Sequence, residues 1–569
     1  MCRQGLKCIK IPGQNESENT GGKAGGLAMI RKVLTTTPGS TAFRDFTVDI
    51  PDLTVITTDV FDRFMDLNHL HDLARSDTRD RHLANAFQKA NLPEELVDQL
   101  GALLKDMQTP LAVRSSSLLE DAMNEPFAGV YATKMIPNNQ FSTDARLRTL
   151  MEAVKFVYAS TFFRNAKSYR KAIGRTDDEE KMAVIIQEVV GLRHGNRFYP
   201  TLSGVARSYN FYSLGNARPQ DGIISLALGL GKTIVEGGRT WTYSPAFPRA
   251  EPPFASRKDL LRQTQTEFWA VNMSKPPTYD PLQETEYLCR GDLGDAEEDG
   301  VLGYLASTYD PQSDRIMMGI GSQGPRVLNF GPLLQLDELP LNNLLKSLLK
   351  TCEDAFQSPV EIEFAVNPAT EPGKPARFGF LQVRPMLVSD EVVTVAESDL
   401  RGEGALVASE QVLGNGQSDT IRDVVYVKPD AFSAKDTWLI AAELDDMNRR
   451  LLESERPYLL IVIGRLGTSD PWLGIPVEWG QVAGARAVVE TSVEEMNVDR
   501  SQGSHFLHNV MNLKVFYFSA DRSGQYPLKW DWLHEQTLAK ESKFIRHVTL
   551  NEPLHIRVDG KSGRGVIYS

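Results

Sequence analysis

The stretch Thr109–Thr133, TPLAVRSSSLLEDAMNEPFAGVYAT, joins a short apolar run to a dense set of polar groups. Residues 111–113 read as a buried strand, and Arg114, three serines and the pair Glu120-Asp121 follow it. Serine hydroxyls and free backbone N–H groups line many phosphate-binding loops. A guanidinium at the end of a buried strand is a natural partner for a phosphate oxygen. The stretch therefore predicts a site for a polyanion.

The same stretch also fits the start of a helix. Ser116 or Ser117 would then be the N-cap, and Glu120 and Asp121 would lie in the first turn. This alternative explains the serines and the acids, but it does not explain an arginine at the end of the strand.

A second polar stretch predicts a β-hairpin. EIEFAV (361–366) and RFGFLQVRP (377–385) alternate in polarity, and the intervening NPATEPGKPA is turn-forming. Alternation places the following residues on shared faces: Glu361 and Glu363 on the first strand, and Phe380, Gln382 and Arg384 on the second. If the polar faces coincide, carboxylate and amide oxygens form a hard-ligand pair suited to Mg²⁺, and the arginine can hold a phosphate. The alternative is a solvated face with a cross-strand ion pair.

Two glycine-rich stretches add weaker signals. GGKAGGL (21–27) places four glycines around Lys23, which fits either a backbone that approaches a ligand or a flexible loop. LALGLGKTIVEGG (226–238) is not a P-loop, because Leu226 stands where the P-loop requires its first glycine. Its glycines are predicted to form tight turns near a ligand.

Bulk properties narrow the class of protein. The 569-residue chain is 41% hydrophobic and carries a net charge of −12, which argues against a general nucleic-acid partner. No apolar run of about 18 residues predicts a membrane span, and the first residues show no signal-peptide pattern. The scattered cysteines predict a reducing compartment without a disulfide framework: Cys2, Cys8, Cys289 and Cys352. A cytoplasmic protein is expected.

Strand-like and helix-like segments alternate along the chain, which predicts an α/β or α+β fold. The expected strands include a buried central one at 182–191, and helices are expected at 144–160 and 341–356. After a linker at 391–419 the pattern changes. Strands and a helix at about 435–453 predict a smaller α/β domain over 420–569.

Together these pieces resemble the N-terminal nucleotide-binding domain of phosphoenolpyruvate synthase and pyruvate phosphate dikinase, an ATP-grasp fold. The resemblance spans residues 20–388. The segments that carry it are GGKAGGL, VRSSSLLEDAMNEPFAG, VIIQEVV, SGVA (203–206), GLG (229–231) and EIEFAV…FGFLQVRP. It implies an α+β fold with two lobes, at 1–180 and 181–390, and a kinase- or dikinase-like phosphotransferase that uses ATP and Mg²⁺.

The resemblance also implies roles for individual residues. Lys23 and Arg114 would contact ATP phosphates, and residues 187–190 would flank the adenine. Those four residues are Gln187, Glu188, Val189 and Val190. Glu363 and Gln382 would hold Mg²⁺, and Arg384 would steady the transferred phosphoryl group.

The chain departs from the family pattern at two places. Lys232 stands where the family usually has an acid, which would alter the metal count or the phosphate contacts. The C-terminal part has no length for the family's barrel, and only SQGSHFLHN (501–509) echoes the phosphohistidine motif. His505 is therefore either a phosphoryl carrier or an ordinary structural histidine.

Two functions follow from these expectations. The first is phosphoryl transfer from Mg-ATP to an acceptor, which is a histidine or a small molecule such as pyruvate. The second is a regulatory module that binds ATP without turnover. The oligomeric state is not predicted.

Overall fold

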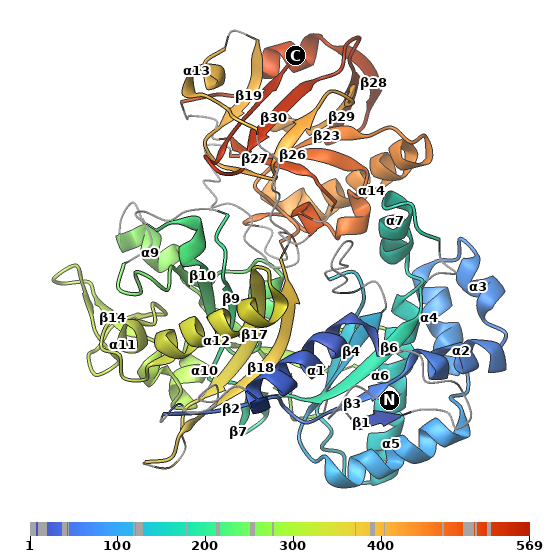
Figure 1. Ribbon diagram of the computed structural model, residues 1–569, viewed down its shortest axis with the longest axis vertical. Coiled ribbons are helices and arrows are strands. Elements are labelled where there is room, and N and C mark those ends of the chain that lie inside the picture. The colour runs from blue at the N-terminus through green and yellow to red at the C-terminus, as the bar shows by residue number, and fades with distance from the viewer. Residues whose placement is uncertain are drawn as a thin grey trace.

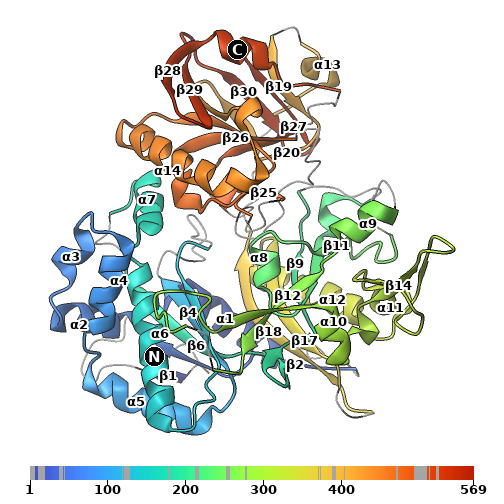
Figure 2. The same ribbon diagram turned by 180° about the vertical axis from the view of Figure 1, so that it is seen from behind.

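The structure is a computed structural model. It describes residues 7–9, 20–36, 43, 45–117, 120, 129–176, 180–211, 217–250, 257–275, 278–369, 371, 373–386, 393–402, 404–468, 472–492, 506, 509–511, 513–520 and 525–569. Figures 1 and 2 show two lobes side by side, with a third body, the C-terminal domain, across them.

The first lobe is built on a five-stranded sheet of order β1-β3-β6-β4-β5. Its strands are β1 Lys7–Ile9, β3 Leu53–Ile56, β6 Met182–Glu188, β4 Leu111–Ser117 and β5 Thr133–Ile136. Its helices are α1 Gly21–Thr36, α2 Thr58–Leu67, α3 His71–Arg75, α4 Asp80–Lys89, α5 Glu94–Asp106, α6 Thr143–Ser160 and α7 Arg164–Ala172. The continuous apolar run of β6 occupies the middle of the sheet, as predicted, because both of its faces are covered.

The second lobe is built on a six-stranded sheet of order β11-β10-β9-β17-β18-β2. These strands are β11 Trp241–Tyr243, β10 Ile223–Leu228, β9 Leu202–Arg207, β17 Val360–Asn367, β18 Ala376–Pro385 and β2 Phe46–Asp49. Smaller sheets contain β13 Leu288–Asp292, β12 Glu267–Asn272, β8 Arg197–Tyr199 and β7 Leu192–His194, and β15 Arg315–Met317, β14 Ser307–Asp310 and β16 Arg326–Val327. The helices are α8 Lys232–Val235, α9 Arg257–Gln263, α10 Leu293–Glu298, α11 Gly331–Leu334 and α12 Leu341–Phe356.

The GGKAGGL stretch is helical, so the interpretation of it as a flexible loop is wrong. It forms the first turns of α1, which packs against β4 and β18. A Cβ at Gly21 would lie 1.7 Å from the carbonyl oxygen of Ser116, and one at Gly26 would lie 2.8 Å from that of Val383. These two glycines therefore permit close packing of the helix on the strands of both lobes.

The predicted hairpin is present, but it contains a bulge. Glu361 pairs with Arg384 and Glu363 with Gln382, and the register then shifts so that Phe364 pairs with Phe380. Simple alternation predicts that Phe380 shares a face with Gln382 and Arg384, and this is wrong. Because of the bulge, Phe380 faces the hydrophobic core.

The C-terminal domain stacks two sheets. The larger has the order β20-β27-β26-β23-β22-β29-β28, and β22, β23, β26 and β27 within it are parallel. Its strands are β20 Val412–Leu413, β27 Phe516–Ala520, β26 Ala485–Thr491, β23 Tyr458–Ile463, β22 Asp423–Val427, β29 Ile545–Thr549 and β28 Thr537–Glu541. The smaller sheet contains β19 Ala405–Ser409, β31 Arg564–Tyr568, β30 His555–Asp559 and β21 Gly416–Ser418. A short pair is formed by β24 Arg465–Leu466 and β25 Gly474–Ile475, and the helices are α13 Glu397–Leu400, α14 Thr437–Glu453 and α16 Trp530–Glu535. The predicted fold class, an α+β fold followed by a smaller α/β unit, is confirmed.

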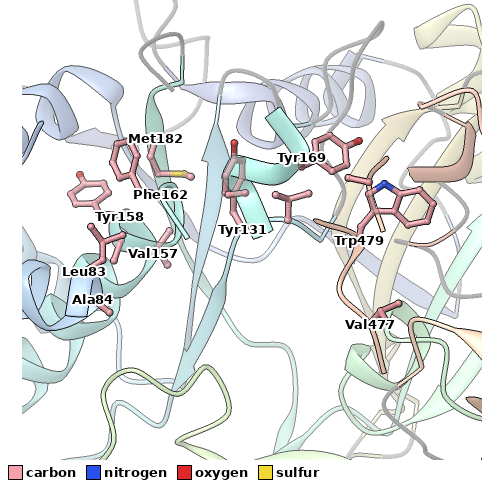
Figure 3. Packing of buried hydrophobic residues seen from close by; sticks show 14 of the residues in the cluster. Leu83, Ala84, Tyr131, Val157, Tyr158, Phe162, Tyr169, Met182, Val477 and Trp479 are labelled. Atoms are coloured by element: carbon pink, nitrogen blue, oxygen red, sulfur yellow. The ribbon is translucent and has the colours of Figure 1, made fainter. Parts of the chain in front are cut away.

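The C-terminal domain contacts both lobes. On the first lobe, the Gly480 N–H donates to Asn165 Oδ1 over 2.5 Å, and Arg486 Nη2 donates to the carbonyl of Ala172 over 3.1 Å. On the second lobe, Arg465 Nη1 donates to the carbonyl of Gly237 over 3.1 Å. Figure 3 shows Trp479 and Val477 of the C-terminal domain in the same hydrophobic cluster as Tyr131 and Tyr169 of the first lobe.

Two expectations about the chain as a whole have different outcomes. Cys8 is disulfide-bonded, which the expectation of a reducing compartment without a disulfide framework did not include, whereas Cys289 and Cys352 are free. Among the described residues, no helix combines the length and the apolar character that a membrane span requires.

Candidate functional site

One cavity of about 770 Å³ lies where the two lobes and the C-terminal domain meet. It brings together all the candidate residues that the structure describes: Lys23, Arg114, Gln187, Glu188, Val189, Val190, Lys232, Glu363, Gln382 and Arg384. His505 lies outside the described residues. We call the part lined by Lys23, Arg114, Glu363, Gln382 and Arg384 the hairpin end of the cavity.

Lys23 is held by polar side chains that follow the apolar run of β4. Its ammonium forms an ion pair with the fully buried Glu120 and donates to Ser115 Oγ over 3.2 Å. Ser116 Oγ donates to the carbonyl of Thr20 over 2.9 Å. Ser116 lies within β4, so the interpretation of Ser116 as a helix cap is wrong. Ser117 ends the strand and makes the reciprocal bonds of a capping box: its Oγ accepts from the Glu120 N–H over 3.1 Å, and its own N–H donates to Glu120 over 3.0 Å. Ser115 and Ser116 hold Lys23 and the start of α1.

Arg114 connects the two lobes. Its Nη1 donates to Gln187 Oε1 over 3.1 Å and to the carbonyl of Leu381 over 3.0 Å, and its Nη2 donates to Gln382 Oε1 over 2.6 Å. Leu381 is the residue that the register shift leaves without a partner on β17, and its carbonyl accepts from Arg114. The bulge thus gives Arg114 an acceptor that alternation alone would not provide.

The two glutamates of the hairpin have different surroundings. Glu361 is fully buried and accepts from Arg384 Nε over 2.9 Å and from Arg207 Nε over 2.5 Å. Glu363 lies 3.7 Å from Arg114 and 3.8 Å from Arg384, and its side chain is 16% exposed. Glu361 therefore orients Arg384, while Glu363 has oxygens that face the cavity.

Lys232 belongs to a second cluster of charges on the cavity wall. Its ammonium lies 2.5 Å from Glu236 and 3.7 Å from Glu284. Burial lowers the pKa of Lys232, but the two carboxylates outweigh burial and hold that pKa above its ordinary value. The lysine is thus charged on the wall of the cavity.

Residues 187–190 divide into polar and apolar parts. The side chain of Glu188 pairs with Arg377 over 2.9 Å and so joins β6 to β18. Val189 belongs to an apolar cluster with Ala112, Leu230 and others, and several of its members line the cavity. This apolar part suits a planar base, since small-molecule sites are lined mostly by apolar groups.

Sequence reasoning missed several residues of this site. Met135 and Leu288 line the apolar part, and Arg207 shares Glu361 with Arg384. Residues of the C-terminal domain also line the cavity, and among the described residues these include Arg465, Thr468, Glu478 and Trp479. These four residues of the C-terminal domain lie in one Gly-, Trp- and Pro-rich stretch, 464–480, whose composition could have pointed to them. Met135, Leu288 and Arg207 lie on three separate strands with no local motif.

Two lobes around a cavity, with cations on one wall and an acid, an amide and a guanidinium on the other, define a nucleotide-binding protein of the ATP-grasp type. The family model described as "Pyruvate phosphate dikinase, AMP/ATP-binding domain" matches residues 17–403, well over half of the chain. The chain belongs to this family.

One curated relative is similar over part of the chain. It is the uncharacterized phosphotransferase YvkC of Bacillus subtilis (strain 168), 27% identical over 194 residues. The match covers 34% of this chain and 20% of the relative, so the aligned part is about a fifth of the relative's length.

Proposed function

We propose that the protein is an ATP-dependent phosphotransferase that binds Mg-ATP in the cavity between its lobes. The observation that carries this proposal is the convergence of Lys23 and Arg114 with Glu363, Gln382 and Arg384 on one cavity. Family membership and the name of the relative support the same class of activity. Phosphoryl transfer depends mainly on positioning and charge neutralisation, which these groups supply.

The nucleotide would lie with its base in the apolar part of the cavity and its phosphates at the hairpin end. Lys23 and Arg114 would neutralise phosphate oxygens, and both are held in place by partners on their own lobe. Lys232 would add a third cation. Arg384, oriented by Glu361, would bind the phosphoryl group as it transfers.

Glu363 and Gln382 fit a magnesium ion. They are direct cross-strand neighbours, and their carboxylate and amide oxygens are the hard ligands that Mg²⁺ prefers. Magnesium sites of this kind use one or two carboxylates together with substrate phosphates. Bound there, the ion would neutralise charge on the phosphate oxygens.

The acceptor is a histidine or a small molecule, and His505 remains a candidate carrier. Incubation of the purified chain with Mg²⁺ and terminally labelled ATP tests the proposal. We expect label on the protein or on an added small molecule, together with release of AMP or ADP. Tight nucleotide binding with neither product would instead support an ATP-binding regulatory module. The ion pairs that hold Lys232 on the wall favour that second function.

A further inference from the structure

A row of three charged side chains crosses neighbouring strands behind the hairpin end. Strands β9, β17 and β18 are adjacent in the six-stranded sheet (Figure 1). Glu361 of β17 pairs directly with Arg207 of β9 on one side and with Arg384 of β18 on the other. Directly opposed residues of antiparallel strands extend from the same face of a sheet. The two guanidinium groups therefore lie on either side of one carboxylate.

The next row on the same face belongs to the cavity. Glu363 pairs with Val205 and with Gln382, two residues away on each strand, and all three line the cavity. Arg384 lines it as well, whereas Arg207 is absent from the described lining. Arg207 therefore acts on a bound nucleotide through other residues and not by contact.

The hydrogen bonds divide the carboxylate of Glu361 between the two arginines. Its Oε1 accepts from Arg384 Nε over 2.9 Å and from Arg384 Nη2 over 2.5 Å, and its Oε2 accepts from Arg207 Nε over 2.5 Å. The side chains of Glu361, Arg384 and Arg207 are 0%, 3% and 6% exposed, so dissolved salt screens their charges little. Two guanidinium groups and one carboxylate leave one net positive charge beside the cavity.

The second arginine changes what Arg384 presents to a ligand. A buried carboxylate paired with Arg384 alone would cancel its charge, because an ion pair has no net charge. Arginine–carboxylate pairs are also frequently bidentate, and Arg207 occupies the oxygen that a bidentate pair would need. Arg207 thus holds Glu361 in a position that orients Arg384 without fully neutralising it.

From this arrangement we propose that Arg207 is a positioning residue for phosphoryl transfer, which preserves the positive charge of Arg384 by sharing Glu361 with it. This inference rests on the proposed function. Arg207 directly follows the segment SGVA, 203–206, and no local pattern in the sequence links it to the hairpin. The pairing of β9 with β17 makes the link.

Matched variants separate the charge of Arg207 from its hydrogen bond. Arg207→Gln keeps a donor for Glu361 and removes the charge, whereas Arg207→Lys keeps the charge. Initial rates of AMP or ADP release by the full chain with Mg-ATP measure turnover per folded molecule. We expect Arg207→Gln to lower kcat at least about tenfold and to change KM for ATP less than about fivefold, because charge at the transferring group is lost. Arg207→Lys should stay within about threefold of the wild-type kcat.

A double variant shows whether Arg207 acts through Arg384. In the Arg384→Ala background, Arg207→Gln should lower kcat less than about twofold further, since the charge that Arg207 preserves is already gone. Losses that multiply independently overturn the proposal, as does an unchanged kcat in Arg207→Gln alone. If Arg207→Gln does not fold, Arg207→Lys still decides, because a loss above about tenfold with the charge retained overturns the proposal.

Arg146→Gln is the control for a purely structural role. Arg146 is also buried, and it bonds Asn138 and two backbone carbonyls of the first lobe. Its loss should change stability and leave kcat per folded molecule unchanged.

Binding separates a failure of this inference from a failure of the proposed function. A wild-type chain that binds nucleotide but releases neither AMP nor ADP contradicts the proposed function. Calorimetry then decides the inference: Arg207→Gln should lower the affinity for a non-hydrolysable ATP analogue relative to AMP by about threefold, and Arg207→Lys should not. An unchanged ratio in Arg207→Gln overturns the inference, and a chain that binds no nucleotide overturns both.

Discussion

At the hairpin end of the cavity the charged groups are paired with counter-charges or amides, whereas Glu478, which the C-terminal domain adds to the cavity lining, is exposed. Arg114 and Arg384 are held by Gln382 and Glu361, over 2.6 and 2.9 Å. The difference indicates that the hairpin end is arranged in advance for a charged ligand, whereas the side of the cavity that the C-terminal domain forms is open to solvent at Glu478.

The largest effect is expected from removing Glu361, the buried carboxylate behind the hairpin end. Glu361→Gln leaves Arg207 and Arg384 buried without their counter-charge, so we expect a loss of about 3–5 kcal/mol in the free energy of unfolding. Denaturant titration measures it. The matched variant Glu363→Gln should cost less than about 1 kcal/mol, since that carboxylate makes only distant ion contacts, but it should weaken the magnesium dependence of turnover. Equal losses in the two variants would show that the glutamates do not have separate roles.

Arg384 tests whether the hairpin end performs chemistry. Arg384→Ala should reduce turnover by at least about a hundredfold, because a cation that stabilises the transferring group is lost. Much of the nucleotide affinity should remain, since Lys23 and Arg114 are unchanged. Initial rates and nucleotide titrations measure the two quantities. Arg401→Ala, at an exposed side chain, is the control. Unchanged turnover in Arg384→Ala would remove this residue from the mechanism.

A buried acid of the first lobe, Glu180, should make stability depend on pH. Tyr131 lines the cavity and donates to Glu180 over 2.6 Å. Burial, aided by the charge of Glu120, raises the pKa of Glu180 from 4.5 to about 7, although Tyr131 and Arg170 act against the shift. The folded state therefore retains a proton that the unfolded state has lost. The contribution of this acid is most favourable below pH 4.5 and is lost as pH rises to about 7.

Comparison with Glu180→Gln isolates this effect. The stability of the wild-type chain relative to the variant should fall between pH 4.5 and about 7, by up to about 3 kcal/mol. Thermal unfolding across that range measures it. A difference that is constant or rises with pH would contradict the assignment.

Gly480 tests whether its contact with Asn165 holds the C-terminal domain on the first lobe. A Cβ there would lie 2.1 Å from Asn165 Oδ1, so Gly480→Ala should loosen the contact between the C-terminal domain and α7 at a cost of about 1–3 kcal/mol. Limited proteolysis and thermal unfolding measure the change. Gly303→Ala, where a Cβ would meet nothing within 4 Å, is the control. If both variants behave alike, the contact does not hold the domain.

Much of the hairpin end could be predicted because its residues lie in short segments with local signals. The alternating polarity of 361–366 and 377–385 indicates a hairpin. Because side chains alternate between the two faces of a strand, Glu363 is expected on the polar face, and in the structure it pairs with Gln382. The bulge at Leu381 could not be predicted, because it depends on how the strands pair. Its consequence is large, since it turns Phe380 into the core and supplies an acceptor for Arg114.

The alternative of a flexible loop at 21–27 was wrong for a related reason. Glycine frees the backbone in a loop, but it also permits close packing within a helix, and composition does not separate these uses. Only the position of α1 against the Ser116 and Val383 carbonyls decides between them. The part of the cavity that the C-terminal domain lines was foreseen less, because the Gly-, Trp- and Pro-rich composition of 464–480 does not say which of its side chains face a cavity.

The sequence by itself determined the order and type of the main strands and helices, the family, and the residue types that converge on the cavity, because periodicity and short motifs are local properties. Tertiary structure alone decided which polar groups are already satisfied. Glu361 accepts from both Arg207 and Arg384, whereas Glu363 keeps oxygens that face the cavity. Such pairing joins residues far apart in the chain, and only folding sets the distances between them.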